Sequence, residues 1–372
     1  METSSSNPEN STSHFFGSPK STAGLIIDQS QEAFEDIDGA TLSLIDTVIN
    51  CILINIVSFF GTIGNVLNII VLARHGFAES TTILLMAVSV ADLVFVFTLF
   101  LKRIICVVAQ IDPVTAIILD VTVTGYLWIA NRFFGLFSSS LVVAISIERF
   151  IAVYFPFKVS TLLSPRNTFI IVGVLGVSWV LLLGPIWGIQ AVEWSFNPQF
   201  NMTLPVIVFS PEAYKNLYQI LALNFIISVI RGPISVVVIL VCSFAIIRRL
   251  RKATRKRSKM TSSTTEVTDV KVVKMLLIVS LVYASIALPL AAPFFLVFLA
   301  PKFVSKGNNN MSNLTLVMET CNDLLYVINA SINFLIYVTM SSKFYKTYIG
   351  LFSCCRGRAK LKDGQRINQI VK

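Results

Sequence analysis

The residues of this sequence that could do chemistry are charged side chains set in, or at the end of, long apolar stretches. Glu148 and Arg149 stand side by side where the run SSSLVVAISI gives way to ERF, and Asp92 lies within AVSVADLVF. A charge inside hydrocarbon costs roughly 2.5–3.5 kcal/mol on insertion scales, so each of these groups must pair, reach water or carry a function. For Asp92, a proton relay, a cation site and a structural pair all stay open, and Arg149 could simply anchor the helix end in the cytoplasm.

A second set of charges lies towards the opposite ends of the apolar stretches. Arg132 stands some 25 Å from Arg149 along one helix, and Lys102 stands about 15 Å from Asp92 along another, at the helical rise per residue. The full set comprises Lys102, Arg103, Arg132 and Arg231, with Glu319 and Asp323 as acidic counterparts. Two interpretations stand: the bases pair internally with Asp323 or Asp120, or they face a cavity for a ligand with a carboxylate or another acceptor-rich group.

The elements that must position these residues are membrane-spanning helices. The chain has 372 residues, of which 55% are hydrophobic and only 13% charged, whereas about 25% would be charged in a soluble domain. A helix needs roughly 20 apolar residues to cross a bilayer, and seven runs have about that length. They lie at about 45–73, 80–105, 118–154, 168–190, 217–247, 271–299 and 315–340. The sequence therefore predicts an all-α membrane protein, a bundle of seven transmembrane helices without an internal repeat.

Charge asymmetry predicts how this bundle is oriented. Residues 1–50 carry eight acids and one base, whereas 248–274 carry ten bases and two acids, and 341–372 carry eight bases and one acid. Because basic loops stay in the cytoplasm, we expect an extracellular N-terminus and a cytoplasmic C-terminus at the plasma membrane. Four glycosylation sequons fall in segments placed outside, at Asn10, Asn201, Asn310 and Asn313. A fifth, at Asn329, lies inside the last span, where a glycan could not be attached.

The segments outside the bundle have distinct compositions. Residues 1–42 are rich in Ser, Thr, Asn and acids, which predicts a disordered, glycosylated extracellular tail, and 43–340 form the transmembrane domain. The first residues lack a basic region and an apolar core, so no cleavable signal peptide is expected. Residues 341–355 predict a short amphipathic eighth helix along the membrane surface, and 356–372 a cytoplasmic tail. Cys354 and Cys355 end that helix as candidate palmitoylation sites, or as unmodified thiols.

The string around Arg149 has a specific resemblance. Glu148-Arg149-Phe150 followed by IAVYFP resembles the acid-Arg-aromatic motif and second intracellular loop of rhodopsin-like (class A) G-protein-coupled receptors. The other matches, over roughly residues 45–355, are Asn65, Asp92, Trp179, Pro233, Pro289, Asn333 and Tyr337. The local pattern is most similar to invertebrate peptide or chemosensory receptors of that family.

The resemblance implies a function and partners. An extracellular ligand, a peptide or an acidic or polar small molecule, would open the cytoplasmic side to a heterotrimeric G protein, and a receptor kinase and arrestin would follow. Arg149 matches the arginine that receives the G protein, with Glu148 and Tyr337 beside it. Asp269 falls where the family places the acid that locks this arginine. The basic stretch 251–269 would contact the G protein, carry kinase targets and lie beside anionic lipid.

The resemblance also implies an allosteric sodium ion and no other cofactor. Its ligands would be Asp92, Ser138, Asn329 and Asn333. Asn329 and Asn333 are four residues apart and share one helix face. The sequence has no C-x-x-C spacing and only two His, so a Cys/His metal site is not expected.

Several positions depart from the family pattern. Thr124 stands where the family has the Cys of its usual disulfide, so Cys106 and Cys321, both placed near the outer helix ends, are the alternative pair. Ala287 replaces the sixth-helix Trp, and Phe334 replaces the Pro of the seventh-helix motif. Asn131 stands where amine receptors keep an acid. We therefore disfavour a monoamine ligand and count Asn131 with the outer basic residues as lining the ligand pocket.

Other classes of protein fit the sequence less well. A transporter should show repeated halves with broken helices in matching places, and an intramembrane enzyme needs a nucleophile with a base, whereas neither His14 nor His75 lies within an apolar run. Basic runs between spans do not favour nucleic acid. A receptor-like protein that has lost signalling remains open, because of the departures above.

Overall fold

A computed structural model describes residues 37–257, 273–288 and 313–351 of the chain. Six of its helical stretches are long and apolar enough to cross a membrane, and a shorter apolar helix covers Val273–Leu288. The six are Gly39–His75, Ser80–Val108, Pro113–Tyr154, Pro165–Trp187, Leu217–Lys252 and Asn313–Met340. Each predicted run has a counterpart among these helices, and the rest of the predicted run 271–299 lies outside the described residues.

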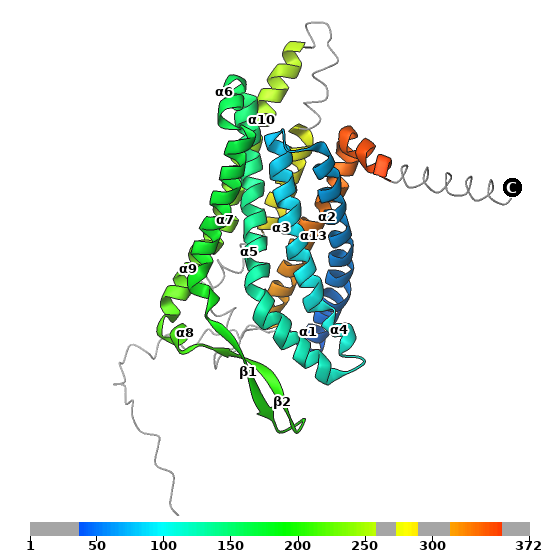
Figure 1. The fold of residues 1–372 in the computed structure, drawn as a ribbon, viewed down its shortest axis with the longest axis vertical. Helices are drawn as coiled ribbons and strands as arrows, with labels where there is room; N and C mark the ends of the chain where they lie inside the picture. The colour runs from blue at the N-terminus through cyan, green and yellow to red at the C-terminus, as the bar shows by residue number, and fades with distance from the viewer. Residues whose placement is uncertain (1–36, 258–272, 289–312, 352–372) are drawn as a thin grey trace, which may run out of the picture. The chain divides into compact units, whose positions relative to one another are not determined.

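The helices follow one another along the chain with short connections (Figure 1). The helices before the hairpin are, in chain order, α1 (Gly39–Asp46), the π-helix η2 (Thr47–Leu53), α2 (Ile54–His75), α3 (Ser80–Arg103), α4 (Ile105–Val108), α5 (Pro113–Tyr154), α6 (Pro156–Leu162) and α7 (Pro165–Trp187). After a hairpin come α8 (Pro211–Lys215), α9 (Leu217–Val229), the π-helix η3 (Ile230–Ile234), α10 (Ser235–Arg257), the helix 273–288, α13 (Asn313–Met340) and a helix over 342–351.

Two helices begin earlier than the sequence analysis predicted. The first begins at Gly39 behind the N-cap Asp38, so the tail predicted over 1–42 ends before it. The third begins at Pro113, because the Asp112 carboxylate accepts the Val114 amide hydrogen and Pro suits the first helical position. Hydrogen bonds, chiefly from the Thr115 hydroxyl, hold the pKa of Asp112 below its usual range.

The core lies where α3 packs against α2 and α5, and where α13 packs against α2. A cluster of buried apolar side chains joins these helices to 273–288, with Val88, Leu141, Ile145, Leu276 and Tyr337 among its members. By contrast α7 exposes large side chains such as Leu181, which is 71% exposed. An exposed apolar face suits hydrocarbon, because lipid solvates it as well as protein does.

The segment between α7 and α9, predicted only as a loop over 191–216, forms an antiparallel hairpin. Strand β1 (Gln190–Asn197) pairs with β2 (Met202–Phe209), with Gln190 opposite Phe209. The hairpin packs on α5 at Gly125, where an added Cβ would lie 2.2 Å from Val192 Cγ2. The absence of a side chain at Gly125 thus lets β1 approach α5, next to the Thr124 position that lacks the family's Cys.

The predicted disulfide between Cys106 and Cys321 is wrong. Cys106 in α4 bonds instead to Cys51 in η2, with a Cα–Cα distance of 5.6 Å, and Cys321 is a free thiol. Because α2 and α3 pack side by side, the outer end of the first span lies beside the short α4 that follows the second. Cys51 lies inside the first predicted apolar run and was not part of the predicted pair.

Candidate functional site

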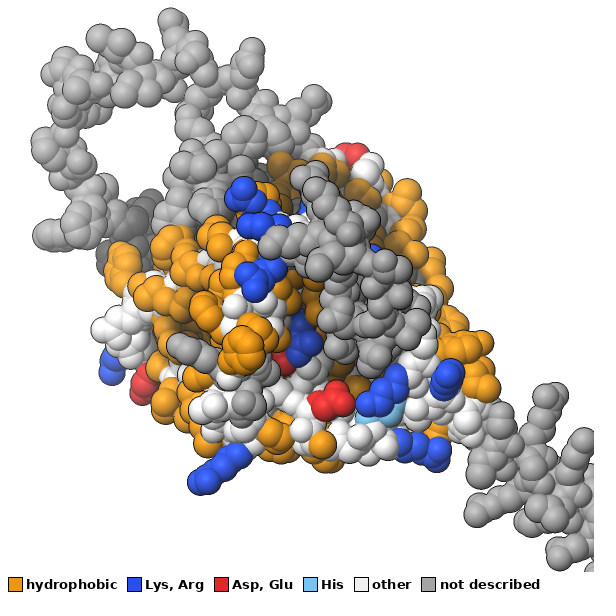
Figure 2. Space-filling model, turned by 90° about the horizontal axis from the view of Figure 1, so that it is seen from above, with side chains coloured by type: hydrophobic (Ala, Val, Ile, Leu, Met, Phe, Trp, Pro, Cys, Tyr) orange, Lys and Arg blue, Asp and Glu red, His pale blue; other side chains and the backbone are white. Residues whose placement is uncertain are grey.

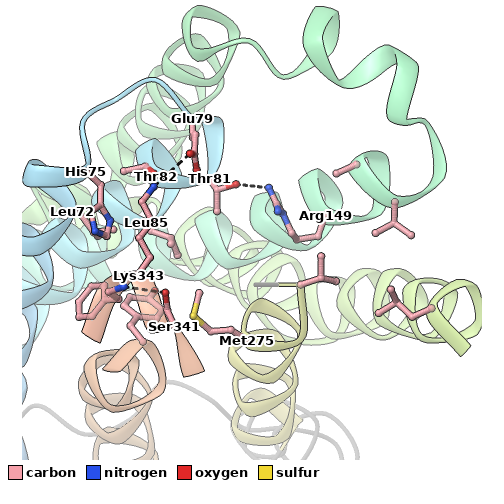
Figure 3. A pocket seen from close by; sticks show the side chains of 16 residues that line it. Leu72, His75, Glu79, Thr81, Thr82, Leu85, Arg149, Met275, Ser341 and Lys343 are labelled. Atoms are coloured by element: carbon pink, nitrogen blue, oxygen red, sulfur yellow. Dashed lines mark hydrogen bonds and ion pairs between the residues drawn. The ribbon is translucent and has the colours of Figure 1, made fainter. Parts of the chain in front are cut away.

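A cavity of about 450 Å³ opens at the end of the bundle that carries the most basic residues. Figure 2 looks onto this end and shows Lys and Arg side chains spread over it. Arg149 of α5, Glu79 before α3, Tyr337 of α13, and His75 and Lys343 line it (Figure 3). This is the end that the charge asymmetry of the sequence predicts to be cytoplasmic.

Arg149 is held at the wall of this cavity by two neighbours. Its Nε and Nη2 donate to the Glu148 carboxylate. Nη2 also lies against Thr81 Oγ1 at the start of α3, a contact that Figure 3 shows. The Thr81 hydroxyl donates to Glu148 at 3.1 Å. Glu148 is buried, so its charge is stabilised by this pairing and hydrogen bonding rather than by water. The predicted lock partner Asp269 lies outside the described residues.

Three further contacts frame the cavity. Tyr337 is 1% exposed and packs edge-on against Phe344 with ring centroids 5.7 Å apart. Its buried hydroxyl has no hydrogen-bond partner in the described ranges. Lys343 lies 3.6 Å from Glu79, and His75 bonds Thr347 at 2.9 Å, so the helix 342–351 is tied to the turn between α2 and α3. Both ties hold the amphipathic helix beside the cavity.

A polar cluster lies deeper in the bundle, on α3, α5 and α13. Asp92 is 2% exposed; the Ser138 hydroxyl donates to its Oδ1 at 2.5 Å, and the Asn333 amide donates to its Oδ2 at 2.7 Å. Three of the four predicted sodium ligands are thus brought together. The fourth, Asn329, forms no hydrogen bond to them.

The outer basic residues line two adjoining cavities of about 230 and 360 Å³. Arg132, Arg231 and Asp323 border both; Lys102 and Asn131 border the first, and Glu319 the second. Six of the seven predicted pocket residues therefore line these outer cavities, and the exception is Arg103. Arg103 reaches them indirectly, because it pairs with Asp323 at 2.8 Å.

The two interpretations of the outer charges hold for different residues. Internal pairing holds for Arg103, whose partner is Asp323. Arg132 donates instead to the neutral side chain of Asn224, and the Arg231 guanidinium lies 3.8 Å from the ring centroid of Tyr326. Within the part of the chain that is described, neither of these two guanidinium groups pairs with a carboxylate.

Some residues of these sites were not predicted. Asn224 is a lone amide in the apolar run LALNFIISV, and its isolation is a signal that could have found it. Nothing in the sequence singles out Thr81 or Tyr326 in the same way. Asn131, which was predicted, borders the first cavity, but its amide is engaged with α3: it donates to the Thr98 hydroxyl at 2.8 Å and to the Phe95 carbonyl at 3.0 Å.

Two of the predicted glycosylation sites, Asn201 and Asn313, lie within the described residues. Asn201 lies exposed in the hairpin turn with a positive φ of 49°. The Asn313 amide donates to the Ile37 carbonyl at 2.6 Å. Asn10, Asn310, Cys354 and Cys355 lie outside the described residues.

A family model of the serpentine type 7TM GPCR chemoreceptor Srw matches residues 50–355. The chain belongs to this family. As an Srw-family chain it is a multi-pass membrane protein, and the helices above are its transmembrane bundle. It is 25% identical over 315 residues to the FMRFamide receptor of Drosophila melanogaster, an alignment covering 81% of this chain and 53% of the relative. It is 32% identical over 146 residues to the human galanin receptor type 2, covering 38% of this chain and 35% of that receptor. The chain thus spans about half or less of the length of these relatives.

Proposed function

We propose that this Srw-family protein is a G-protein-coupled receptor at the plasma membrane, with its N-terminus outside and its C-terminus in the cytoplasm. The observation that carries the proposal is Arg149, held by Glu148 and Thr81 at the wall of a cytoplasmic cavity. A charged pair that is also hydrogen-bonded to a neighbouring helix has a second arrangement available, with the arginine turned into the cavity. A partner that occupies the cavity would favour that second arrangement.

The ligand enters, in this proposal, from the opposite end of the bundle. The two outer cavities suit a peptide or an acidic or polar small molecule, since bases and a few hydrogen-bonding groups line them. The names of the two relatives, which give FMRFamide and galanin as their ligands, support the peptide alternative. A receptor kinase and arrestin would act on the cytoplasmic side.

We also propose that Asp92 and Ser138 hold a sodium ion. A carboxylate and a hydroxyl are the hard oxygen donors that suit such a cation. Ser89 stands three residues before Asp92 in α3, and Asn65 donates to the carbonyl of Ala330, three residues before Asn333. The Ser89 hydroxyl and Asn65 Oδ1 are buried without hydrogen-bond partners among the described residues, so they are unused oxygen ligands on helices that carry the cluster or contact it. The ion would supply a positive charge that compensates the buried carboxylate; Ser138 and Asn333 already orient that carboxylate.

Ligand-free nucleotide exchange on a panel of G proteins tests the coupling. We expect Arg149→Ala to lower exchange, because it removes the side chain that faces the cytoplasmic cavity, and Asp269→Ala to raise it, because it removes the proposed lock. Arg166→Ala, at the start of α7 and away from that cavity, is the matched control. Exchange at the level of empty membranes for every form, with surface display confirmed, would contradict basal coupling and favour a receptor-like protein that has lost signalling.

A further inference from the structure

Among the described residues, the side chains that line the outer cavities include more bases than acids. Lys102, Arg132 and Arg231 line them together with two carboxylates. One of these, Asp323, is already paired with Arg103, and Asp120 lies close enough to act on the charge of Lys102. The remaining acid, Glu319, borders only the second cavity and is exposed.

The Arg231 side chain has a hydrogen-bond donor that is still available to a ligand. It lies in the π-helix η3, beside Pro233, and borders both outer cavities. Its guanidinium stacks over Tyr326, an arrangement that stabilises the charge and leaves the edge of the group open to hydrogen-bond acceptors. Its Nε is buried and has no acceptor in the described part of the chain. A buried donor without an acceptor is costly, so an acceptor supplied by a ligand would bind favourably there.

Arg132 faces the same space from α5. Its Nη2 donates to Asn224, a neutral acceptor that leaves the positive charge uncompensated. Arg231 reaches α5 close to Gly135, where a Cβ would meet Phe95 at 3.2 Å and Arg231 Nη2 at 3.6 Å. Two planar guanidinium groups around one cavity match the paired oxygens of a carboxylate, which accept two parallel hydrogen bonds.

From these contacts we propose that the outer cavities bind a carboxylate-bearing ligand, with the carboxylate held by Arg231 and Arg132. This inference rests on the proposed receptor function and names the chemical group that its ligand presents. Lys102 adds long-range attraction at the outer end of the first cavity. A ligand that presents a neutral amide at this position could accept hydrogen bonds from the arginines but would not compensate their charge, so this assignment favours an acid over its amide.

A hydrogen bond also connects the proposed carboxylate site to the helix 273–288. The Tyr283 hydroxyl donates to the Arg231 backbone carbonyl at 3.0 Å, and Tyr283 and Ala287 both border the second cavity. A carboxylate that draws the Arg231 side chain outward would act on the π-helix whose carbonyl holds Tyr283. The small Ala287 leaves the space that a Trp would fill in related receptors.

The test compares acids with their neutral amides. The full-length protein is purified in lipid nanodiscs, and its thermal unfolding is followed while acetate, benzoate or N-acetylphenylalanine is titrated, each against its amide at matched ionic strength. We expect the acids to stabilise the protein at lower concentration than the amides do. If no acid stabilises it more than its amide, the proposal is overturned.

Variants locate the effect. Arg231→Gln and, independently, Arg132→Gln should raise the half-saturating acid concentration about tenfold or more, since a hydrogen bond to a charged group contributes roughly 1.5–3 kcal/mol. Arg231→Lys should lose less, because the charge stays and only the paired donors are lost. Arg166→Gln is the matched control and should leave the concentration unchanged. An unchanged acid preference in both Gln variants would overturn the assignment of the residues.

The unfolding and nucleotide-exchange measurements distinguish a failure of the carboxylate site from a failure of the proposed G-protein coupling. Unfolding needs no G protein, so an acid preference without nucleotide exchange would contradict the proposed function alone. Exchange without an acid preference would contradict the carboxylate site alone.

Discussion

Asp92 shows how much of this chain can be read from single residues. Its burial followed from its place in an apolar run, and its partners Ser138 and Asn333 followed from the receptor resemblance; both hydrogen bonds are present. Asn329 shares the helix face of Asn333 but lies one turn, about 6 Å, further along it, which is too far for the same hydrogen bond. Spacing therefore predicts a shared face and not a contact.

At this scale the sodium proposal makes a direct prediction. Replacing potassium by sodium should raise the unfolding temperature of the parent protein, because an ion bound only to the folded state stabilises it by about 1.4 kcal/mol at ten times its Kd. Asp92→Asn should abolish the difference between the two salts, because the neutral amide removes the charge that holds the cation. The measurement is thermal unfolding of the purified protein in the two salts at equal ionic strength.

Asn329 provides the matched control for this experiment. Asn329→Ala should keep the sodium effect, since its side chain makes no hydrogen bond to Asp92 or Ser138 in the described structure. Equal unfolding temperatures of the parent protein in sodium and potassium would refute the ion site, and the cluster would then be a structural hydrogen-bond network.

At the scale of elements, the helices could be predicted from the sequence, but the hairpin and the disulfide that pack against and join them could not. Each apolar run predicted a helix because a membrane leaves the backbone few alternatives. The early start at Pro113 was signalled by Asp112-Pro113, an N-cap followed by Pro, which hydropathy alone does not register. The hairpin was missed although residues 193–197 of β1 alternate polar and apolar side chains as a strand does. Gly125, which receives Val192, has no signature in a single sequence.

The corrected disulfide gives the prediction for this scale. Cys51→Ser or Cys106→Ser should lower the free energy of unfolding by about 2–4 kcal/mol, because the bond closes a long loop in the unfolded chain. The double variant should lose no more than either single variant, since both remove the same bond. Thermal unfolding with and without reductant measures the loss.

Cys321→Ser separates this pairing from the one that the sequence suggested. It should leave the unfolding temperature and the number of reductant-released thiols unchanged, because Cys321 is free in the structure. If Cys321→Ser instead removed the response to reductant, the bond between Cys51 and Cys106 would be refuted.

At the scale of the whole molecule, the two ends of the bundle differ in chemistry. One end carries Arg149, the helix 342–351 and the bases of α10, where Arg248 and Arg249 are exposed. The other carries the hairpin, the disulfide and the outer cavities; the hairpin and α6 lie at opposite ends in Figure 1. A disulfide and glycosylation sequons suit the oxidising exterior, and exposed bases suit the cytoplasm, so these features support the orientation proposed above.

Glycan mapping tests that orientation. Asn201→Gln should reduce the apparent mass of the expressed protein by one glycan, because the exposed hairpin turn that carries Asn201 lies at the outer end in this orientation. Val159→Asn creates a sequon with Ser160 and Thr161 within α6, at the opposite end, and should leave the mass unchanged. Electrophoresis before and after enzymatic deglycosylation reads both results. A glycan gained by Val159→Asn together with none lost by Asn201→Gln would mean a reversed bundle. The cavity at Arg149 would then face the exterior, where a G protein cannot reach it.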